Sequence, residues 1–266
     1  MKLSISNIAW DENVDETVYT LMKKYGFDGL EIAPTRIFPE NPYDHLDEAA
    51  QWAASLKKEY GFMISSMQSI WYGKTERIFG SEQEREILLD YTKKAILFAE
   101  RIGCHNLVFG CPRNRSLQSG EDERIAIPFF RELGDYAAVH GTVLAMEANP
   151  PIYNTNYIND TAAALNLVKQ VGSRGFLLNL DVGTMIQNGE KVSVLDGNIE
   201  YINHVHISEP GLKPPEERLL HEELMEYLCA YQYGGFVSVE MGRANNTDTV
   251  ENVLIYSNKL LGRVNV

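Results

Sequence analysis

The 266-residue chain has little cysteine, little positive charge and no long apolar run, and each shortage removes a class of protein. Its three cysteines, Cys104, Cys111 and Cys229, are scattered and form no CxxC pair, which fits reduced thiols better than a disulfide framework. With 37 acidic against 24 basic residues, the formal net charge is −13, so a nucleic-acid or anionic-membrane partner is not expected. No apolar stretch approaches the roughly 20 residues of a membrane span, and the apolar start is too short for a signal peptide. These shortages predict a cytoplasmic protein.

Two further absences narrow the fold. No GxGxxG or GxxxxGK[ST] run is present, which disfavours a doubly wound sheet with a phosphate-binding loop. No low-complexity segment or linker divides the chain, so we expect one domain over residues 1–266. That length suits a barrel of eight strands and eight helices, which typically needs about 250 residues.

Strand-like and helix-like segments alternate from end to end. The expected strands lie at 3–9, 27–33, 62–68, 105–110, 142–147, 176–181, 204–208 and 236–240. The expected helices lie at 14–25, 47–60, 82–102, 122–140, 160–171, 192–200, 216–231 and 248–261, with Asp160 as a candidate N-cap. Eight such units predict an α/β fold, a single-domain (β/α)8 TIM barrel.

Four late strands carry an acidic or imidazole side chain at or near the carboxyl end. Glu147 lies in TVLAMEANP, Asp181 in FLLNLDVGTM, His206 in INHVHISEP and Glu240 in FVSVEMG. Barrel enzymes place their active sites at this end of the strands. Three buried carboxylates would repel one another without a cation, and oxygen-rich ligation suits a divalent ion. The set predicts a metal site, although each residue taken alone could be a structural strand cap or core histidine.

These four strand ends resemble those of the xylose isomerase-like TIM barrels, which include sugar isomerases, ketose 3-epimerases, inosose dehydratases and sugar-phosphate isomerase/epimerase proteins. The resemblance covers essentially the whole chain. It implies that Glu147, Asp181, His206 and Glu240 bind one divalent metal ion, Mn²⁺ or Mg²⁺ first, with Co²⁺ or Zn²⁺ as further options. It also implies that Glu147 and Glu240 are the catalytic acid/base pair.

The chain departs from the epimerase pattern at two positions. Thr184 stands where those proteins usually have a substrate-contacting histidine, and Tyr153 stands where they tend to carry a second glutamate. The resemblance therefore implies a retained metal site beside an altered substrate-contacting shell, in which Thr184 and Tyr153 are themselves candidate substrate-binding residues.

Further substrate contacts are expected from residues that follow the earlier strands. Trp10 and Trp71 could cover the apolar face of a sugar, or simply pack over the barrel mouth. Arg113 and Arg115 could bind a carboxylate or phosphate, or be solvated loop charges. Glu31, at the end of the second strand, could hydrogen-bond a hydroxyl or form a structural salt bridge.

Two histidines have weaker cases. His221 follows the loop after the seventh strand, where it could reach the substrate, although a helix-surface role is the alternative. His204 faces the same side of its strand as His206 because side chains alternate along a strand. His206 is favoured as the ligand because it lies nearer the strand's end, and His204 is expected to support it or to be structural.

The predicted constellation indicates a type of chemistry more firmly than its outcome. A divalent cation polarises a hydroxy-carbonyl substrate and stabilises an enediolate, while a glutamate transfers the proton. We therefore expect a metal-dependent isomerase or epimerase of a small sugar or sugar derivative, with a homo-oligomer as one option for its assembly. A lyase or dehydratase of the same fold, or a sugar-binding barrel without turnover, stays open. An apurinic-site endonuclease is disfavoured because six histidines are too few for its metal cluster and the chain is strongly acidic.

Overall fold

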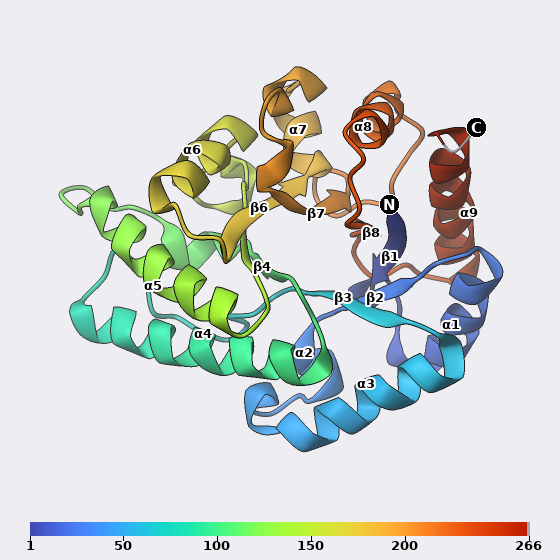
Figure 1. The fold of residues 1–266 in the computed structure, drawn as a ribbon, viewed down its shortest axis with the longest axis horizontal. Helices are drawn as coiled ribbons and strands as arrows, with labels where there is room; N and C mark the ends of the chain where they lie inside the picture. Colours follow the sequence, from blue (N-terminus) through green and yellow to red (C-terminus); the bar gives the residue numbers. More distant parts are fainter. Residues whose placement is uncertain (265–266) are drawn as a thin grey trace.

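A closed barrel of eight parallel strands lies at the centre of this computed structural model, which describes residues 1–264 (Figure 1). Each strand is hydrogen-bonded to the next one along the chain, and β8 pairs with β1 to close the barrel. The strands are β1 (Lys2–Ser6), β2 (Gly29–Ile32), β3 (Met63–Met67), β4 (Leu107–Phe109), β5 (Leu144–Glu147), β6 (Phe176–Asp181), β7 (Ile202–Ile207) and β8 (Phe236–Val239). The predicted (β/α)8 barrel is confirmed.

The helices surround the strands (Figure 1). Apolar side chains of strands and helices pack together in one hydrophobic core. They are α1 (Asp15–Lys24), α2 (Pro34–Ile37), α3 (Leu46–Tyr60), α4 (Glu82–Ile102), α5 (Ala126–Val139), α6 (Thr161–Val171), α7 (Val182–Asn188), α8 (Leu219–Ala230) and α9 (Thr247–Val264). The expected N-cap of α6 is confirmed, because the Asp160 carboxylate accepts a hydrogen bond of 2.8 Å from the Ala163 amide. Local capping and the burial of apolar faces thus act together in placing these helices.

The helix expected at 192–200 was wrong, and its place is taken by two short 3₁₀ segments, Val192–Leu195 and Ile199–Tyr201. The helix of this unit, α7, instead follows β6 without any loop. The Asp181 carboxylate caps it by accepting the Thr184 amide, and Gly189 ends it with a positive φ of 66°. A candidate metal ligand is therefore also the residue that turns the chain from strand to helix.

The first strand is shorter than the expected 3–9, because a 3₁₀ segment, Asn7–Ala9, follows Ser6. The Asn7 side-chain oxygen accepts a hydrogen bond of 2.9 Å from the Ala33 amide, just beyond β2. A buried side chain thus replaces strand pairing at this point and directs the chain toward the barrel mouth.

The inside of the barrel is polar. Glu31 on β2 reaches across to His204 and His206 on β7, and the Gln68 side chain after β3 donates to the Ser6 hydroxyl on β1. Bonds between strands that are not neighbours require these side chains to point into the barrel. Most barrels fill this space with branched apolar residues. Here the apolar core lies mainly between the strands and the helices, and the barrel interior holds polar and ionisable side chains.

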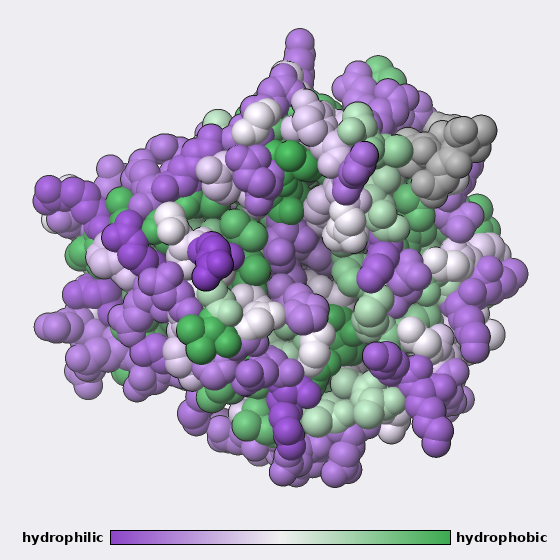
Figure 2. Space-filling model, viewed as in Figure 1, coloured by the Kyte–Doolittle hydropathy of each residue, from purple (hydrophilic) through white to green (hydrophobic). Residues whose placement is uncertain are grey.

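The surface of the molecule is largely hydrophilic in the view of Figure 2. Figure 2 shows hydrophilic residues over most of one face, with apolar side chains scattered among them. No helix within residues 1–264 is long and apolar enough to cross a lipid bilayer.

Candidate functional site

The predicted metal ligands come together at the carboxyl ends of four consecutive strands. Glu147 and Asp181 are the last residues of β5 and β6, His206 is the penultimate residue of β7, and Glu240 directly follows β8. A cavity of about 180 Å³ opens over them, and Glu147, Asp181 and Glu240 all line it. We call it the metal cavity.

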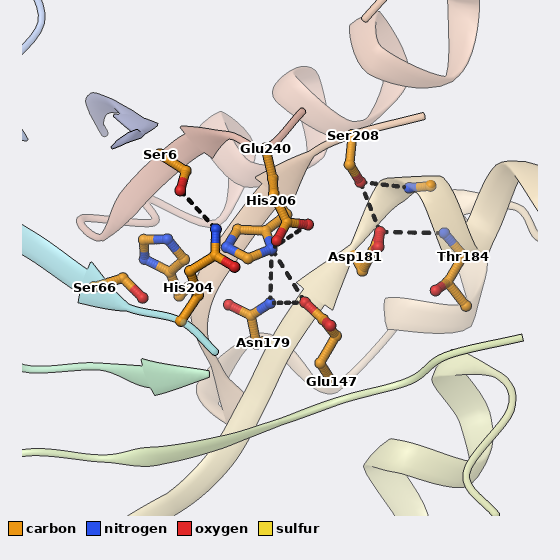
Figure 3. Close-up of polar contacts among 12 residues, drawn as sticks. Ser6, Ser66, Glu147, Asn179, Asp181, Thr184, His204, His206, Ser208 and Glu240 are labelled. Carbon is orange, nitrogen blue, oxygen red and sulfur yellow. Dashed lines mark hydrogen bonds and ion pairs between the residues drawn. The ribbon is translucent and has the colours of Figure 1, made fainter. Parts of the chain in front are cut away.

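His206 is the centre of the tightest cluster. Its Nδ1 lies 3.1 Å from Glu147 Oε1 and 3.4 Å from Glu240 Oε2 (Figure 3). One ligand atom from each of the three side chains lies within 4.8 Å of the other two. Two carboxylates and an imidazole converge here without filling the space between them.

Asp181 lies beside this cluster, where its Oδ1 accepts hydrogen bonds from the Ser208 hydroxyl at 2.6 Å and the Thr184 amide at 3.2 Å (Figure 3). Burial, and then the negative charges of Glu147 and Glu240, raise the pKa of Asp181 from its usual 3.8 to about 7. The carboxylates are thus close enough to oppose one another's ionisation, and a cation among them would remove that opposition.

A fully buried carboxylate lies beneath the cluster. Glu31 Oε2 is 2.8 Å from His206 Nε2 and 3.1 Å from His204 Nε2. Burial works to raise the pKa of Glu31, but the two histidines outweigh it and hold that pKa far below its usual range. Burial likewise works to lower the pKa of His206, but Glu31, Glu240 and Glu147 raise it well above 6.5. The surrounding carboxylates thus favour the protonated form of His206.

These donors fit a divalent cation. An Nε2–H bond from His206 to Glu31 leaves Nδ1 for a ligand on the other side, which is the usual way a carboxylate orients a metal-binding imidazole. The carboxylates of Glu147 and Glu240 beside that nitrogen, together with Asp181 in the same cavity, give an oxygen-rich set of the kind that Mn²⁺ and Mg²⁺ take. In the second acidic and imidazole cluster, both histidines are bonded to Glu31 Oε2, while the buried Glu31 Oε1 has no hydrogen-bond partner among the described residues.

Two asparagines hold Glu147 in place. Asn179 Nδ2 donates to its Oε1 at 2.8 Å, and Asn149 Nδ2 donates to its Oε2 at 3.0 Å. Gly110 is needed opposite, since a Cβ there would lie 2.8 Å from Oε2. The sequence reasoning missed these residues, although Asn179 could have been found, because it lies two residues before Asp181 on the same strand face.

Arg115, considered above as a substrate-binding residue, lies fully buried behind β5. Its guanidinium donates to the Glu147 backbone carbonyl at 2.7 Å and to Asn149 Oδ1 at 2.8 Å. Burial lowers its pKa to about 10. Its contacts hold the backbone and the asparagine that fix Glu147. Arg113, two residues earlier on the same 3₁₀ turn, is exposed.

Of the other candidates, Tyr153 lines the metal cavity, and its hydroxyl accepts the Gly211 amide at 2.9 Å. The buried Thr184 hydroxyl donates to the Ala148 carbonyl at 2.8 Å. Trp71 packs on Phe109, and its indole N–H is bonded at 2.7 Å to a threonine of α4. Only the tyrosine among these three is positioned to meet a ligand.

The last two candidates lie further out. Trp10 is buried, with its indole N–H donating to Asp15 at 2.6 Å, and it lines a different cavity at the barrel mouth. His221 lies in the helical layer, where its Nδ1 is 2.8 Å from the Tyr256 hydroxyl. Burial lowers the pKa of His221 to about 4, so it is neutral at ordinary pH. The structure does not bring His221 to the metal cavity.

A cavity of about 590 Å³ at the opposite end of the barrel is larger than the metal cavity. It lies among residues that begin β3, β7 and β8, such as Met63, Asn203 and Phe236. Within the described part of the chain, no carboxylate lines it. The two cavities therefore differ in their carboxylates, which line the smaller one, and size alone does not identify the candidate site.

Comparisons with known proteins agree with the fold. The model of the xylose isomerase-like TIM barrel family matches residues 19–257. Comparison with curated sequences gives no significant match.

Several solved structures are similar over nearly their whole length. A 3-keto-D-glucoside 4-epimerase from E. coli has a TM-score of 0.75 and 21% identity, covering 97% of this chain and 99% of its own. A D-psicose 3-epimerase from Clostridium cellulolyticum H10 has a TM-score of 0.71 and 19% identity, covering 99% and 95%. An L-ribulose 3-epimerase has a TM-score of 0.77 and 16% identity, covering 100% and 96%. At these identities the similarity establishes the fold.

Proposed function

Because this chain belongs to the xylose isomerase-like TIM barrel family, we propose that it is a metal-dependent isomerase or epimerase of a sugar or sugar derivative. The observation that carries the proposal is the convergence of Glu147, His206 and Glu240, whose ligand atoms lie within 4.8 Å of one another, beside Asp181 in one cavity. Three of the similar structures are sugar epimerases, which supports the same conclusion.

Glu147, Asp181, His206 and Glu240 would hold one ion, Mn²⁺ or Mg²⁺. When bound, such an ion supplies Lewis-acid polarisation of a substrate carbonyl, worth several kcal/mol. The protein's part is to keep the ligands in place. Glu31 orients the His206 ring, Asn149 and Asn179 fix Glu147, and Ser208 fixes Asp181.

Glu147 and Glu240 are the proposed acid/base pair. They reach the cavity from β5 and β8, three strand positions apart around the barrel, so that they would approach a substrate carbon from different sides. Burial raises the pKa of Glu240, which makes it a stronger base than an ordinary glutamate near neutral pH. One glutamate would take a proton from the carbon beside the carbonyl to give an enediolate, and the other would return it to the opposite face. That sequence inverts the carbon and gives epimerisation.

A lyase or dehydratase of the same fold is the second candidate, and Thr184 favours it. Its hydroxyl is already bonded to the Ala148 carbonyl, so this position offers a substrate no polar group in place of the epimerases' histidine. A substrate held differently could lose a β-hydroxyl or an aglycone from the same enediolate. A barrel that only binds sugar would gain nothing from burying carboxylates that repel one another.

Deuterium exchange separates these outcomes. A panel of ketoses, inososes and keto-glycosides would be incubated with the protein and Mg²⁺ in D₂O and analysed by NMR. We expect deuterium at a carbon next to a carbonyl without loss of water or aglycone. Loss of either indicates the lyase. Wild-type protein that exchanges no proton with any of these sugars, at saturating Mg²⁺ or Mn²⁺, contradicts enzymatic function of this kind.

We also propose that the chain works as one domain over residues 1–266 in the cytoplasm. Neither Cys104 nor Cys111 forms a disulfide within residues 1–264, which supports a reducing compartment. Burial raises the pKa of both Cys104 and Cys111 to about 12, so neither is a reactive thiolate at neutral pH.

A further inference from the structure

A second cavity opens at the same end of the barrel as the metal cavity. Its volume is about 610 Å³. It is built from the loops that follow β1, β2, β3 and β8, whereas the metal cavity is built from β3 to β8. Ser69 lines both, so the two cavities adjoin. We call the second one the side cavity, and it is lined by Ile8, Trp10, Thr35, Arg36, Tyr72 and Arg243, among others.

The size of the metal cavity limits what it can hold alone. Pockets for small organic ligands usually measure about 300–1,000 Å³. The metal cavity, at about 180 Å³, is smaller than this range, and the side cavity lies within it. A substrate with its reacting ring over the carboxylates would therefore find room for a further group toward Ser69.

Both arginines of the side cavity are paired with carboxylates, and Glu12 adds a further acidic group to its lining. Arg243 Nη1 lies 2.8 Å from Asp11 Oδ2, and the Arg36 guanidinium makes two bonds to Asp15, the shorter of 2.6 Å. An arginine already neutralised by a carboxylate has little attraction left for a phosphate. The same pairs keep spare N–H donors and oxygen acceptors side by side, which suits hydroxyl groups that both donate and accept.

The side cavity also has an exposed aromatic side chain in its lining. Tyr72 is 71% exposed. Among the exposed large apolar residues of the described chain, it is the aromatic one with the greatest exposure. Deeper in the cavity, Trp10 is held by its bond to Asp15 and lies 5.7 Å from the Arg36 guanidinium. An aromatic ring beside hydroxyl-binding groups matches a sugar ring, which is apolar on its face and polar at its edge.

From this geometry we propose that the side cavity is a second subsite, which binds an uncharged sugar ring linked to the ring that reacts in the metal cavity. The substrate class is then an unphosphorylated glycoside of two rings, and not a free ketose or a sugar phosphate. The inference rests on the proposed function for the choice of the reacting site, but the subsite itself follows from the cavity, its paired charges and Tyr72.

Binding can be measured without turnover. Dissociation constants for maltose, methyl α-D-glucopyranoside and glucose 6-phosphate would be measured by saturation-transfer difference NMR in the presence of Mg²⁺. Maltose should bind about 10-fold more tightly than the one-ring glucoside, with saturation reaching both rings, and glucose 6-phosphate should gain nothing over the glucoside. Tyr72→Ala should weaken maltose binding about 10-fold. Tyr231→Ala, which removes a tyrosine 51% exposed after α8, is the matched control and should not.

Equal affinity for one and two rings, no maltose binding, an unchanged affinity in Tyr72→Ala, or preference for glucose 6-phosphate would each overturn the subsite. A failure of the subsite can be distinguished from a failure of the proposed function. Sugar-dependent deuterium exchange without a two-ring preference would leave the isomerase or epimerase standing and remove the subsite. Tyr72-dependent maltose binding in a protein that exchanges no proton would keep the subsite and contradict the proposed isomerase or epimerase.

Discussion

His204 and His206 lie on the same strand, point into the same barrel and share one oxygen of Glu31, yet their surroundings give them opposite properties. Burial lowers the pKa of His204, whose other neighbours add little charge. The pKa of His206 is raised, because Glu240 and Glu147 add their charges to that of Glu31 and together overcome burial. The neighbours of a residue, and not its type, thus decide which of the two histidines has a raised pKa. We call the level of His206, where Glu147 and Glu240 line the metal cavity, the upper layer. The level of His204, which lines the cavity at the opposite end of the barrel, is the lower layer.

The largest effect is expected from the glutamates of the upper layer. Glu147→Gln and Glu240→Gln keep size and one oxygen donor but remove the base, so each should slow substrate C–H exchange by about 10²-fold or more. Exchange would be followed by NMR in D₂O at saturating Mg²⁺, with circular dichroism melting as the test of folding. Glu132→Gln, on the surface of α5, is the matched control. A Glu147→Gln protein that melts normally, binds metal and exchanges at the wild-type rate rules out the mechanism.

The two histidines themselves should differ in metal affinity. His206→Asn removes a proposed ligand, so Mn²⁺ affinity should fall at least 10-fold, whereas His204→Asn should change it only a few-fold and instead cost about 1–3 kcal/mol of stability by unpairing a buried group. Isothermal titration with Mn²⁺ and chemical denaturation measure the two quantities. Equal losses of Mn²⁺ affinity in both variants would show that the two layers do not differ in metal binding.

Glu31 links the layers and is expected to act through orientation. Glu31→Gln keeps the shape but replaces the shared acceptor, so the His206 ring should lose its fixed tautomer and Mg²⁺ affinity should fall about 10-fold. Nitrogen-15 NMR of the imidazole, recorded with diamagnetic Mg²⁺, reports the tautomer directly. An unchanged His206 spectrum together with unchanged affinity would show that Glu31 is only a structural partner.

The smallest effect concerns pH and the metal-free protein. The pKa of Asp181 is about 7 in the folded chain against 3.8 ordinarily, so the folded state holds its proton more tightly. The stability this provides is fully present below about pH 4 and is lost as pH rises through 7. We expect the melting temperature gained by adding Mn²⁺ to grow over the same interval, because metal binding displaces that proton. Asp181→Asn should flatten the dependence, and a gain independent of pH in wild type would contradict it.

The fold was predictable from sequence because its signals are local. Alternating segments and strand-end carboxylates indicated the barrel and brought Glu147, Asp181, His206 and Glu240 into view. The helix expected at 192–200 was wrong, because the helix of that unit, α7, begins directly after Asp181, whose carboxylate caps it. A residue at a strand end can serve as cap and candidate ligand at once.

The partners of the site were harder to predict because they depend on contacts between distant strands. Glu31 meets His206 across 175 positions of sequence, and Arg115 reaches the Glu147 carbonyl across 32. Nothing in the local pattern of either residue distinguishes a charge facing a substrate from one buried against a backbone carbonyl. Trp71 was misleading for the same reason, since a tryptophan after a strand can as well pack on Phe109 as cover a sugar.

The most direct test is a crystal structure of the Mn²⁺-loaded protein with anomalous diffraction at the manganese edge. The account predicts one strong peak in the upper layer, about 2.0–2.4 Å from oxygens of Glu147, Asp181 and Glu240 and from Nδ1 of His206. Glu31 should remain bonded to His206 Nε2. A peak between Glu31 and the two histidines, or no peak at all in protein soaked at millimolar Mn²⁺, would contradict the central claim that these four strand ends form the metal site.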